Sequence, residues 1–294
     1  MSAEVGAGQG QSATLARLAR LSRSALYVPG DAPDKLRKAL DRGADELIVD
    51  LEDAVVAERK PLARDVIAAW LEGLAPSDVR IWVRINAGAE READLAALAG
   101  CEGIDGFVVA KTEGAAELVK VDRLLEAAGS SAVVVPLLES ANAILAAHAI
   151  AGAPRVHRLQ IGEADLRADV GITPGDDERE LLYSRSHVVF ASRAAGIAPP
   201  IAPVSTEFRD LDALRASTAA LARLGFVGRA CIHPAQVAVV NEVFTPTPAE
   251  IAEARQILAA LAAAGGGSGV ALDARGRMID EAVARQARQL LARA

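Results

Sequence analysis

The chain has 294 residues, 51% of them hydrophobic and 3% aromatic, and its formal net charge is −7. This length suits a single α/β barrel of ~250 residues, and the acidic charge excludes the basic face that nucleic acids and anionic membranes require. The two cysteines, Cys101 and Cys231, lie far apart, and no apolar run reaches the ~20 residues that cross a bilayer. We therefore expect a cytoplasmic protein without disulfides or a membrane partner.

Residues 1–22 are rich in Gly, Ala, Ser and Gln, which predicts a flexible N-terminal segment that ends in a short helical lead-in. Beyond it, short β-branched runs alternate with longer stretches rich in Ala, Leu and Arg. The predicted strands lie at residues 24–28, 46–52, 80–86, 106–111, 132–139, 157–162, 199–204 and 227–232. The predicted helices lie at residues 33–42, 58–72, 91–99, 113–127, 141–150, 178–195, 210–224 and 235–244.

Eight strand–helix units over residues 23–246 predict a parallel sheet that is buried on both faces. Such a sheet most simply closes into a (β/α)8 TIM barrel, and an open doubly wound sheet is the alternative. Residues 247–294 continue with a helix after Pro248, a glycine-rich run at 265–269 and a final helix from near Asp280. This C-terminal part is too small for a domain, so we predict a helical lid or an arm that reaches a neighbouring subunit.

Chemistry in such a barrel gathers at the carboxyl ends of the strands, so strands that end in polar residues are informative. The second strand ends in Asp50, Glu52 and Asp53, and alternation places Asp50 and Glu52 on one face. The alternative is an acidic cluster at a helix N-terminus, favoured by the helix dipole. Against it stands the cost of leaving Asp50 charged inside an apolar strand.

The third strand carries Arg84 between apolar residues, so its guanidinium needs a buried anion. The planar fork of an arginine suits a carboxylate or an enolate oxygen of a substrate. A structural salt bridge to Asp50 and Glu52 is the alternative, and both interpretations can hold together.

The fifth strand ends at Glu139, and the sixth leads into Asp165. Neighbouring parallel strands end at the same edge of a sheet, so the two carboxylates can share a cation. Mg²⁺ commonly takes one or two protein carboxylates together with substrate and water, which this pair fits. The alternative is that one residue here only caps the following helix, as Ser140 or Asp165 could.

Two other polar residues close strands. Lys111 ends the fourth strand, where it is expected to pair with a phosphate or with the acidic cluster. His233 follows the eighth strand, where a hydrogen-bonded loop histidine is more common than a catalytic base. The sequence has no Walker A motif, nucleotide-binding glycine fingerprint or serine nucleophile elbow. A metal pair, an arginine and further carboxylates remain, a set that suits the stabilisation of an enolate.

The order of these motifs resembles the citrate lyase beta-subunit-like proteins of the HpcH/HpaI aldolase superfamily, which are related to malyl-CoA and citramalyl-CoA lyases. The matching segments are RSALYVPG at 23–30, DLEDAV at 50–55, VRIN at 83–86, LES at 138–140, GEADL at 162–166, IHP at 232–234 and GRMID at 276–280. The resemblance covers the chain from about residue 23 to its C-terminus.

The resemblance implies a barrel with Mg²⁺, or Mn²⁺ in its place, on Glu139 and Asp165, where the substrate carboxylate and an adjacent oxygen would chelate the ion. Arg84 would bind the oxygen that becomes negative as a carbon–carbon bond breaks. Asp53, with Glu52, would orient this arginine or take part in proton transfer.

The resemblance further implies an acid/base aspartate on the C-terminal arm, delivered from an adjacent subunit of a homotrimer or hexamer. The matching position is Asp280. Arg23, Lys111 and the loop at 232–234 would line a coenzyme A channel. Ala110 departs from the family pattern, which often has proline before the lysine, and the glycine-rich lead loosens the placement of Asp280.

The expected reaction is the magnesium-dependent cleavage or formation of a small 3-hydroxyacyl-CoA. Cleavage would give an acyl-CoA such as acetyl-CoA and an oxo-acid, by a retro-Claisen route through an enolate. Three alternatives stay open: a coenzyme A-independent aldolase that releases pyruvate, a malyl-CoA thioesterase or malate synthase-like activity, and a non-catalytic ligand-binding barrel.

Overall fold

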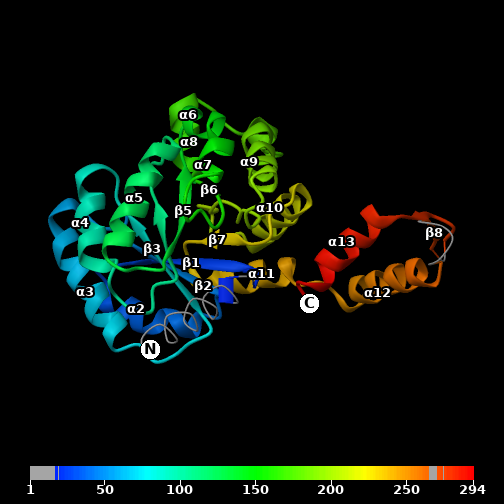
Figure 1. The fold of residues 1–294 in the computed structure, drawn as a ribbon, viewed down its shortest axis with the longest axis horizontal. Coiled ribbons are helices and arrows are strands. Elements are labelled where there is room, and N and C mark those ends of the chain that lie inside the picture. The colour runs from blue at the N-terminus through cyan, green and yellow to red at the C-terminus, as the bar shows by residue number, and fades with distance from the viewer. Residues whose placement is uncertain (1–16, 19, 265–269, 274) are drawn as a thin grey trace, which may run out of the picture. The chain divides into compact units, whose positions relative to one another are not determined.

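The computed structural model describes residues 17–18, 20–264, 270–273 and 275–294 of the chain (Figure 1). Most of the N-terminal segment predicted to be flexible, and the whole glycine run at 265–269, lie outside the described residues. The chain divides into two compact units, of which the first ends at Asn241 and the second is Glu242–Ala294. Among the helices that the structure describes, none is both long and apolar enough to cross a bilayer.

The first unit is built on a parallel sheet of seven strands that curls into a barrel-like form, with helices around its outside (Figure 1). The sheet order is β6-β5-β4-β3-β2-β1-β7. Its strands are β1 (Ser24–Pro29), β2 (Glu46–Asp50), β3 (Arg80–Ile85), β4 (Gly106–Val109), β5 (Val133–Leu138), β6 (Gln160–Ile161) and β7 (Arg229–Cys231). The α/β class and the parallel sheet predicted from the sequence are therefore confirmed.

The prediction of a seventh strand at residues 199–204 was wrong. The structure has only isolated parallel bridges there, from Gln160 to Ile201 and from Ala202 to Arg229. The sequence explains the reduction, since three prolines in this segment lack the N–H that a strand ladder needs. Ile201 and Ala202 thus connect the two edge strands of the sheet.

The helices of the first unit follow the strands. They are α2 (Pro33–Ala39), α3 (Lys60–Glu72), α4 (Gly88–Leu98), α5 (Ala115–Ala127), α6 (Ala141–Leu145), α7 (Ala147–Ala151), α8 (Glu163–Val170), α9 (Leu182–Ala194), α10 (Leu211–Leu224) and α11 (Pro234–Phe244). In α10 the buried residues Leu214, Thr218 and Leu221 recur at helical spacing, so one face packs inward. The side chain of Asp210 caps its first turn and accepts a hydrogen bond from the Ala213 amide.

Two helical predictions needed correction. The helix predicted at 141–150 is broken at Ala146 into α6 and α7. The helix α8 was not predicted, because Leu166 is its only buried residue and no apolar stripe marks it. This second difference matters for the site, since Asp165 lies in the first turn of α8 rather than in a loop.

One buried cluster draws apolar side chains from strands all around the sheet, including Ala25, Ile48, Trp82, Val108 and Ala230. These side chains fill the middle of the fold. The polar residues at the strand ends therefore stand above a packed interior rather than beside an open channel.

The second unit contains α12 (Pro248–Ala263), a short antiparallel pair of strands and α13 (Glu281–Leu291). The pair consists of β8 (Ala271–Leu272) and β9 (Met278–Ile279). A capping box opens α12, in which the Thr247 hydroxyl and the Glu250 carboxylate each accept a hydrogen bond from the other residue's amide. Ala284 and Ala287 of α13 are buried.

Candidate active site

A cavity of about 410 Å³ lies at the carboxyl ends of the strands in the first unit. Its charged lining residues are those that end β2, β3 and β5 or begin α8, namely Asp50, Asp53, Arg84, Glu139, Glu163 and Asp165. Apolar side chains such as Leu137, Val204 and Ile232 complete the wall. The sequence had placed its candidate residues at this edge, and most of them do meet there.

Asp50 organises the acidic loop after β2. It is 1% exposed, and its two carboxylate oxygens accept hydrogen bonds from the amides of Glu52, at 2.9 Å, and Ala54, at 3.0 Å. The next helical turn, at Ala57–Arg59, begins only after this loop and has no side-chain cap. The alternative of an acidic cluster at a helix N-terminus was therefore wrong.

Arg84 is held between acidic residues and an aromatic ring. Its Nε and Nη2 donate to the two oxygens of Asp50 at 2.6 Å each, and Nη1 lies 2.8 Å from Glu52 Oε2. The guanidinium carbon lies 5.0 Å from the centroid of the Tyr27 ring. Burial alone would lower the pKa of Arg84, but the hydrogen bonds to Asp50 and the nearby charges raise it, so the group stays cationic. The predicted salt bridge is present.

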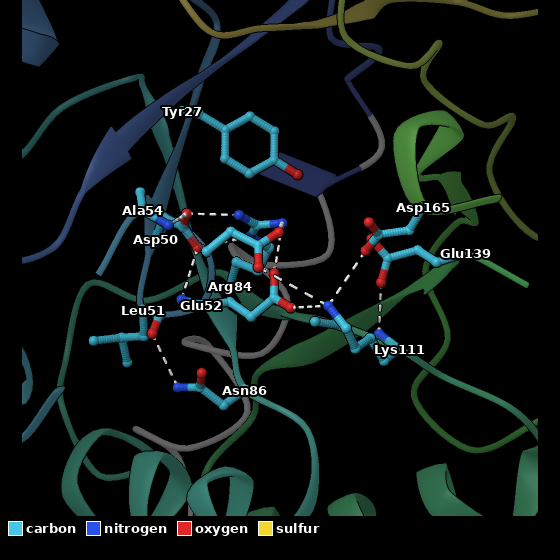
Figure 2. A network of polar contacts seen from close by, with 12 residues as sticks. Tyr27, Asp50, Leu51, Glu52, Ala54, Arg84, Asn86, Lys111, Glu139 and Asp165 are labelled. Atoms are coloured by element: carbon cyan, nitrogen blue, oxygen red, sulfur yellow. Dashed lines mark hydrogen bonds and ion pairs between the residues drawn. The ribbon is translucent and has the colours of Figure 1, made fainter. Parts of the chain in front are cut away.

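Lys111 lies at the centre of the charged cluster (Figure 2). Its Nζ is 2.5 Å from Glu52 Oε1 and 3.3 Å from Asp165 Oδ2, while its backbone amide donates to Glu139 Oε2 at 2.8 Å. Its φ of 51° is in the left-handed region, which is uncommon for a residue with a side chain. Of the two partners predicted for Lys111, the structure shows the acidic cluster.

Glu139 is 7% exposed and its carboxylate lies against the backbone at Gly162. A Cβ at Gly162 would come within 2.4 Å of Glu139 Oε1, so only glycine leaves room for this carboxylate. Burial, followed by the charges of Glu52 and Asp165, raises the pKa of Glu139 to about 7. Ser140 is the cap of α6 and accepts from the Ala143 amide, so capping does not occupy Glu139.

Glu139 and Asp165 lie side by side and both face Lys111 (Figure 2). The charged cluster contains two cations, Arg84 and Lys111, and five carboxylates, those of Asp50, Glu52, Asp53, Glu139 and Asp165. This excess of negative charge suits an added cation. Within the described parts of the chain no group of three or more His, Cys, Asp or Glu could hold a metal, but Mg²⁺ commonly needs only one or two protein carboxylates. The residues present therefore fit a divalent ion.

Tyr27 and Gln160 line the same cavity and were missed in the sequence. Gln160 Nε2 donates to Tyr27 Oη at 3.1 Å, and burial raises the pKa of Tyr27 to about 12, so the phenol stays protonated. Gln160 is 2% exposed, and its Oε1 has no hydrogen-bond partner among the described residues. Gln160 could have been found in the sequence, because it is a polar residue in a short apolar run, as Arg84 is. Tyr27 could not, because an aromatic residue is common in a buried strand.

Three further candidate residues are held by contacts of their own. Arg23 precedes β1, at the opposite end of the strand, where its Nη2 pairs with Asp45 Oδ1 at 2.8 Å. His233 accepts a hydrogen bond from the Ala235 amide and stacks on Phe208, as a loop histidine does. Asp280 belongs to the second unit, where it caps α13 and accepts from the Val283 amide.

Fold and cavity together define an α/β enzyme whose charged side chains gather at the carboxyl ends of parallel strands. The sequence matches the HpcH/HpaI aldolase/citrate lyase family over residues 23–234. A citrate lyase subunit beta-like protein of Deinococcus radiodurans is 37% identical over 280 residues, covering 92% of this chain and 96% of that protein. An L-malyl-CoA/beta-methylmalyl-CoA lyase of Rhodobacter capsulatus is 34% identical over 305 residues, covering 94% and 95%.

Among solved structures, CitE of Mycobacterium tuberculosis in complex with magnesium, acetoacetate and coenzyme A is similar, with a TM-score of 0.78 and 28% identity. The match covers 93% of this chain and 98% of that one. The chain belongs to the HpcH/HpaI aldolase/citrate lyase family, and it is a lyase. The resemblance seen in the sequence is confirmed.

Proposed function

We propose that the protein is a magnesium-dependent carbon–carbon lyase that acts on a small 3-hydroxyacyl-CoA and releases an acyl-CoA and an oxo-acid. One observation carries this proposal: Arg84, Glu139 and Asp165 converge on one cavity, with Glu52 and Asp53 beside them. Family membership supports it, as do the malyl-CoA substrate in the name of one relative and the magnesium and coenzyme A of the CitE complex.

Glu139 and Asp165 would hold the divalent cation. The chemistry that a bound cation supplies is the Lewis-acid polarisation of substrate oxygens. The side chains are suited to this role because burial, and then the charges of neighbouring carboxylates, raise the pKa of Glu139, and a bound cation would favour its charged form.

Arg84 would stabilise the negative charge that appears when the carbon–carbon bond breaks. The bond between the carbon beside the thioester and the carbon bearing the hydroxyl is cleaved, and its electron pair passes to the acyl-CoA enolate. Asp50 fixes the guanidinium from one side and leaves other N–H groups of the fork for the enolate oxygen. A preorganised cation of this kind lowers the barrier because it need not reorient during the reaction.

The hydroxyl proton must leave as that carbon becomes the carbonyl of the oxo-acid. Asp53 and Glu52 are the proposed acceptors, or they orient Arg84, whose Nη1 lies 3.7 Å from Asp53 Oδ2 and 2.8 Å from Glu52 Oε2. Asp53 is the freer of the two, with a side chain 62% exposed, whereas Glu52 also pairs with Lys111. We therefore favour Asp53 for proton transfer and Glu52 for orientation.

The enolate carbon must then take up a proton, and this is the proposed role of Asp280. The proposal includes a homotrimer or hexamer in which the C-terminal arm at residues 247–294 of one subunit completes the site of the next. It also includes closure of the sheet into a (β/α)8 barrel through Ile201 and Ala202, whose bridges join β6 to β7. Lys111 would contribute by neutralising part of the acidic cluster.

The test is an assay of malyl-, citramalyl-, methylmalyl- and citryl-CoA, each with Mg²⁺ and with EDTA. Release of an oxo-acid and free acyl-CoA from at least one substrate, lost in EDTA and restored by Mg²⁺, is the expected result. Cleavage of a coenzyme A-free hydroxy-oxo-acid alone would assign a pyruvate-releasing aldolase, and free malate with free coenzyme A would assign a thioesterase. Turnover unaffected by EDTA would contradict the metal requirement.

The role of Asp280 needs its own variant. Asp280→Asn should lower the rate of cleavage and of proton exchange at the acyl-CoA carbon beside the thioester, with the affinity for Mn²⁺ unchanged. Asp212→Asn, on the exposed face of α10, is the matched control. Unchanged turnover in Asp280→Asn would remove this residue from the mechanism. Turnover in mixtures of Asp280→Asn and Arg84→Lys proteins would show whether the aspartate acts across subunits.

A further inference from the structure

A second cavity, of about 530 Å³, lies at the amino ends of the strands, at the opposite end of the sheet from the candidate active site. Its walls come from the segment before β1, the first residues of β3 and β5, and the segments that precede β6 and β7. Four arginines line it, Arg20, Arg80, Arg155 and Arg158, together with His157. Within the described part of the chain, no Asp or Glu is among its lining residues.

The inner wall of this cavity holds a buried excess of positive charge. Glu46 is fully buried and pairs with two arginines, through Arg80 Nη2 at 2.9 Å and Arg158 Nη1 at 3.0 Å. Two cations thus share one carboxylate, and both are less than 5% exposed. Burial and the neighbouring Arg158 lower the pKa of Arg80, and burial with Arg158 lowers the pKa of His157 to about 3. Arg80 Nη1 also donates to the carbonyl of Arg20 at 2.6 Å, and the charge of the buried Asp105 acts on Arg80. The lining of the cavity itself stays positive, so it favours an anion.

Hydrogen-bond donors are also in excess here. Arg158 Nε and Trp82 Nε1 are buried and have no acceptor among the described residues. The Arg158 guanidinium carbon lies 4.9 Å from the centroid of the Trp82 ring. The ring of His157 also stacks on Trp82, with the two centroids 5.8 Å apart. Both unpartnered atoms can only donate and are buried behind the cavity wall, so they add to the positive potential that an anion in the cavity would meet.

The outer wall offers guanidinium groups that a ligand could reach. Arg20 is exposed. Arg155 is anchored, with Nε donating to Asp122 at 2.5 Å and Nη1 to the carbonyl of Ser130 at 2.7 Å. The fixed guanidinium of Arg155 and the exposed one of Arg20, which also interacts with the charge of Asp45, suit an oxyanion, which accepts several hydrogen bonds at once.

We propose that this cavity is a binding site for a compact multivalent oxyanion, a phosphate or a polycarboxylate, separate from the candidate active site. Its recognition would come from Arg20 and Arg155 at the entrance and from the excess charge of Arg80 and Arg158 behind them. Because the two cavities lie at opposite ends of the sheet, the site does not depend on the proposed lyase function.

The test is calorimetric titration of the full chain, freed of metal ions on a chelating resin, with inorganic phosphate at low ionic strength and no soluble chelator, with citrate and chloride as further arms. Saturable binding of phosphate or citrate, with none for chloride at equal ionic strength, is expected. Arg20→Gln should weaken it about tenfold, since it removes a charge-assisted contact from an exposed side chain. Arg123→Gln, the same charge change on the exposed face of α5, should bind like the unchanged protein.

The variant Arg84→Lys tests which of the two cavities binds the phosphate. It alters the candidate active site alone, so phosphate affinity should be retained. Retained affinity in Arg84→Lys together with weakened affinity in Arg20→Gln supports the proposal. Chloride-like behaviour of phosphate and citrate, equal weakening in Arg123→Gln and Arg20→Gln, or loss confined to Arg84→Lys would each overturn it.

Discussion

The two ends of the curled sheet are built with opposite charge. At the carboxyl end, five carboxylates surround Arg84 and Lys111, whereas at the amino end Arg80 and Arg158 share the carboxylate of Glu46, with the charge of Asp105 also acting on Arg80. At each end the pKa of one residue is shifted in the direction that favours its neutral form. Burial and like charges raise the pKa of Glu139, and burial with a like charge lowers the pKa of Arg80. Each cluster would therefore be stabilised by an ion of the opposite sign, a cation at the carboxyl end and an anion at the amino end.

The largest expected effect is at the carboxyl end. Glu139→Ala should reduce kcat/KM by roughly 10⁴-fold, about 5 kcal/mol of transition-state stabilisation, because it removes one of only two candidate metal ligands. Steady-state kinetics and Mn²⁺ binding measure it. Asp165→Ala should behave alike, and both proteins should keep the circular dichroism spectrum of the unchanged chain. Normal Mn²⁺ affinity in both variants would show that the excess negative charge serves something other than a metal.

The next effect tests the amino end. Glu46→Gln leaves Arg80 and Arg158 buried without their carboxylate, so the free energy of unfolding should fall by about 4 kcal/mol. Urea unfolding measures the change, and Glu92→Gln on the exposed face of α4 is the control. Adding Arg158→Met to Glu46→Gln should recover part of the loss, and no recovery would mean that the two arginines are not energetically coupled to Glu46.

A third prediction uses the pH dependence of the carboxyl end. The pKa of Glu139 is raised from 4.5 to about 7, so in EDTA the folded state holds this proton more tightly than the unfolded state. Its stabilising contribution is present below about pH 4.5 and is lost as pH rises toward 7, a loss of roughly 3 kcal/mol. The difference in unfolding free energy between the unchanged chain and Glu139→Gln, followed from pH 4 to 8, isolates it. A difference that stays constant over this range would contradict the raised pKa.

The smallest effect concerns Tyr27. Tyr27→Phe keeps the ring beside Arg84 but removes the hydroxyl that contacts Gln160, so we expect about a fivefold rise in KM, ~1 kcal/mol, with kcat nearly unchanged. Initial-rate kinetics decide it. If kcat and KM both stay the same, the hydroxyl contributes to neither substrate binding nor the site's electrostatics.

Much of the active-site set could be predicted from the sequence because its members break the strand pattern. Arg84 is a charge between apolar strand residues, and Glu139 ends an apolar run, so their positions alone suggest a strand-end site. The ion pairs between residues far apart in the sequence could not be predicted in the same way. Arg158 meets Glu46 from 112 residues away, and this contact depends on the curl of the sheet rather than on any local pattern.

The errors in the fold have local causes. The segment at 199–204 is apolar enough for a strand, but its prolines remove the donors that a ladder uses. The helix α8 carries too few apolar residues to be recognised, although it positions Asp165. Helix and strand periodicity report burial, so elements that face the site rather than the core give weak signals.

The contact between Gly162 and Glu139 has a consequence for how the protein tolerates change. The same residue that makes room for one candidate metal ligand also begins the helix that carries the other, so one backbone joint sets where both carboxylates lie. In a library of all single substitutions, position 162 should accept as little variation as the acidic positions themselves. A residue without a functional group would then be inherited as strictly as the groups that do the chemistry.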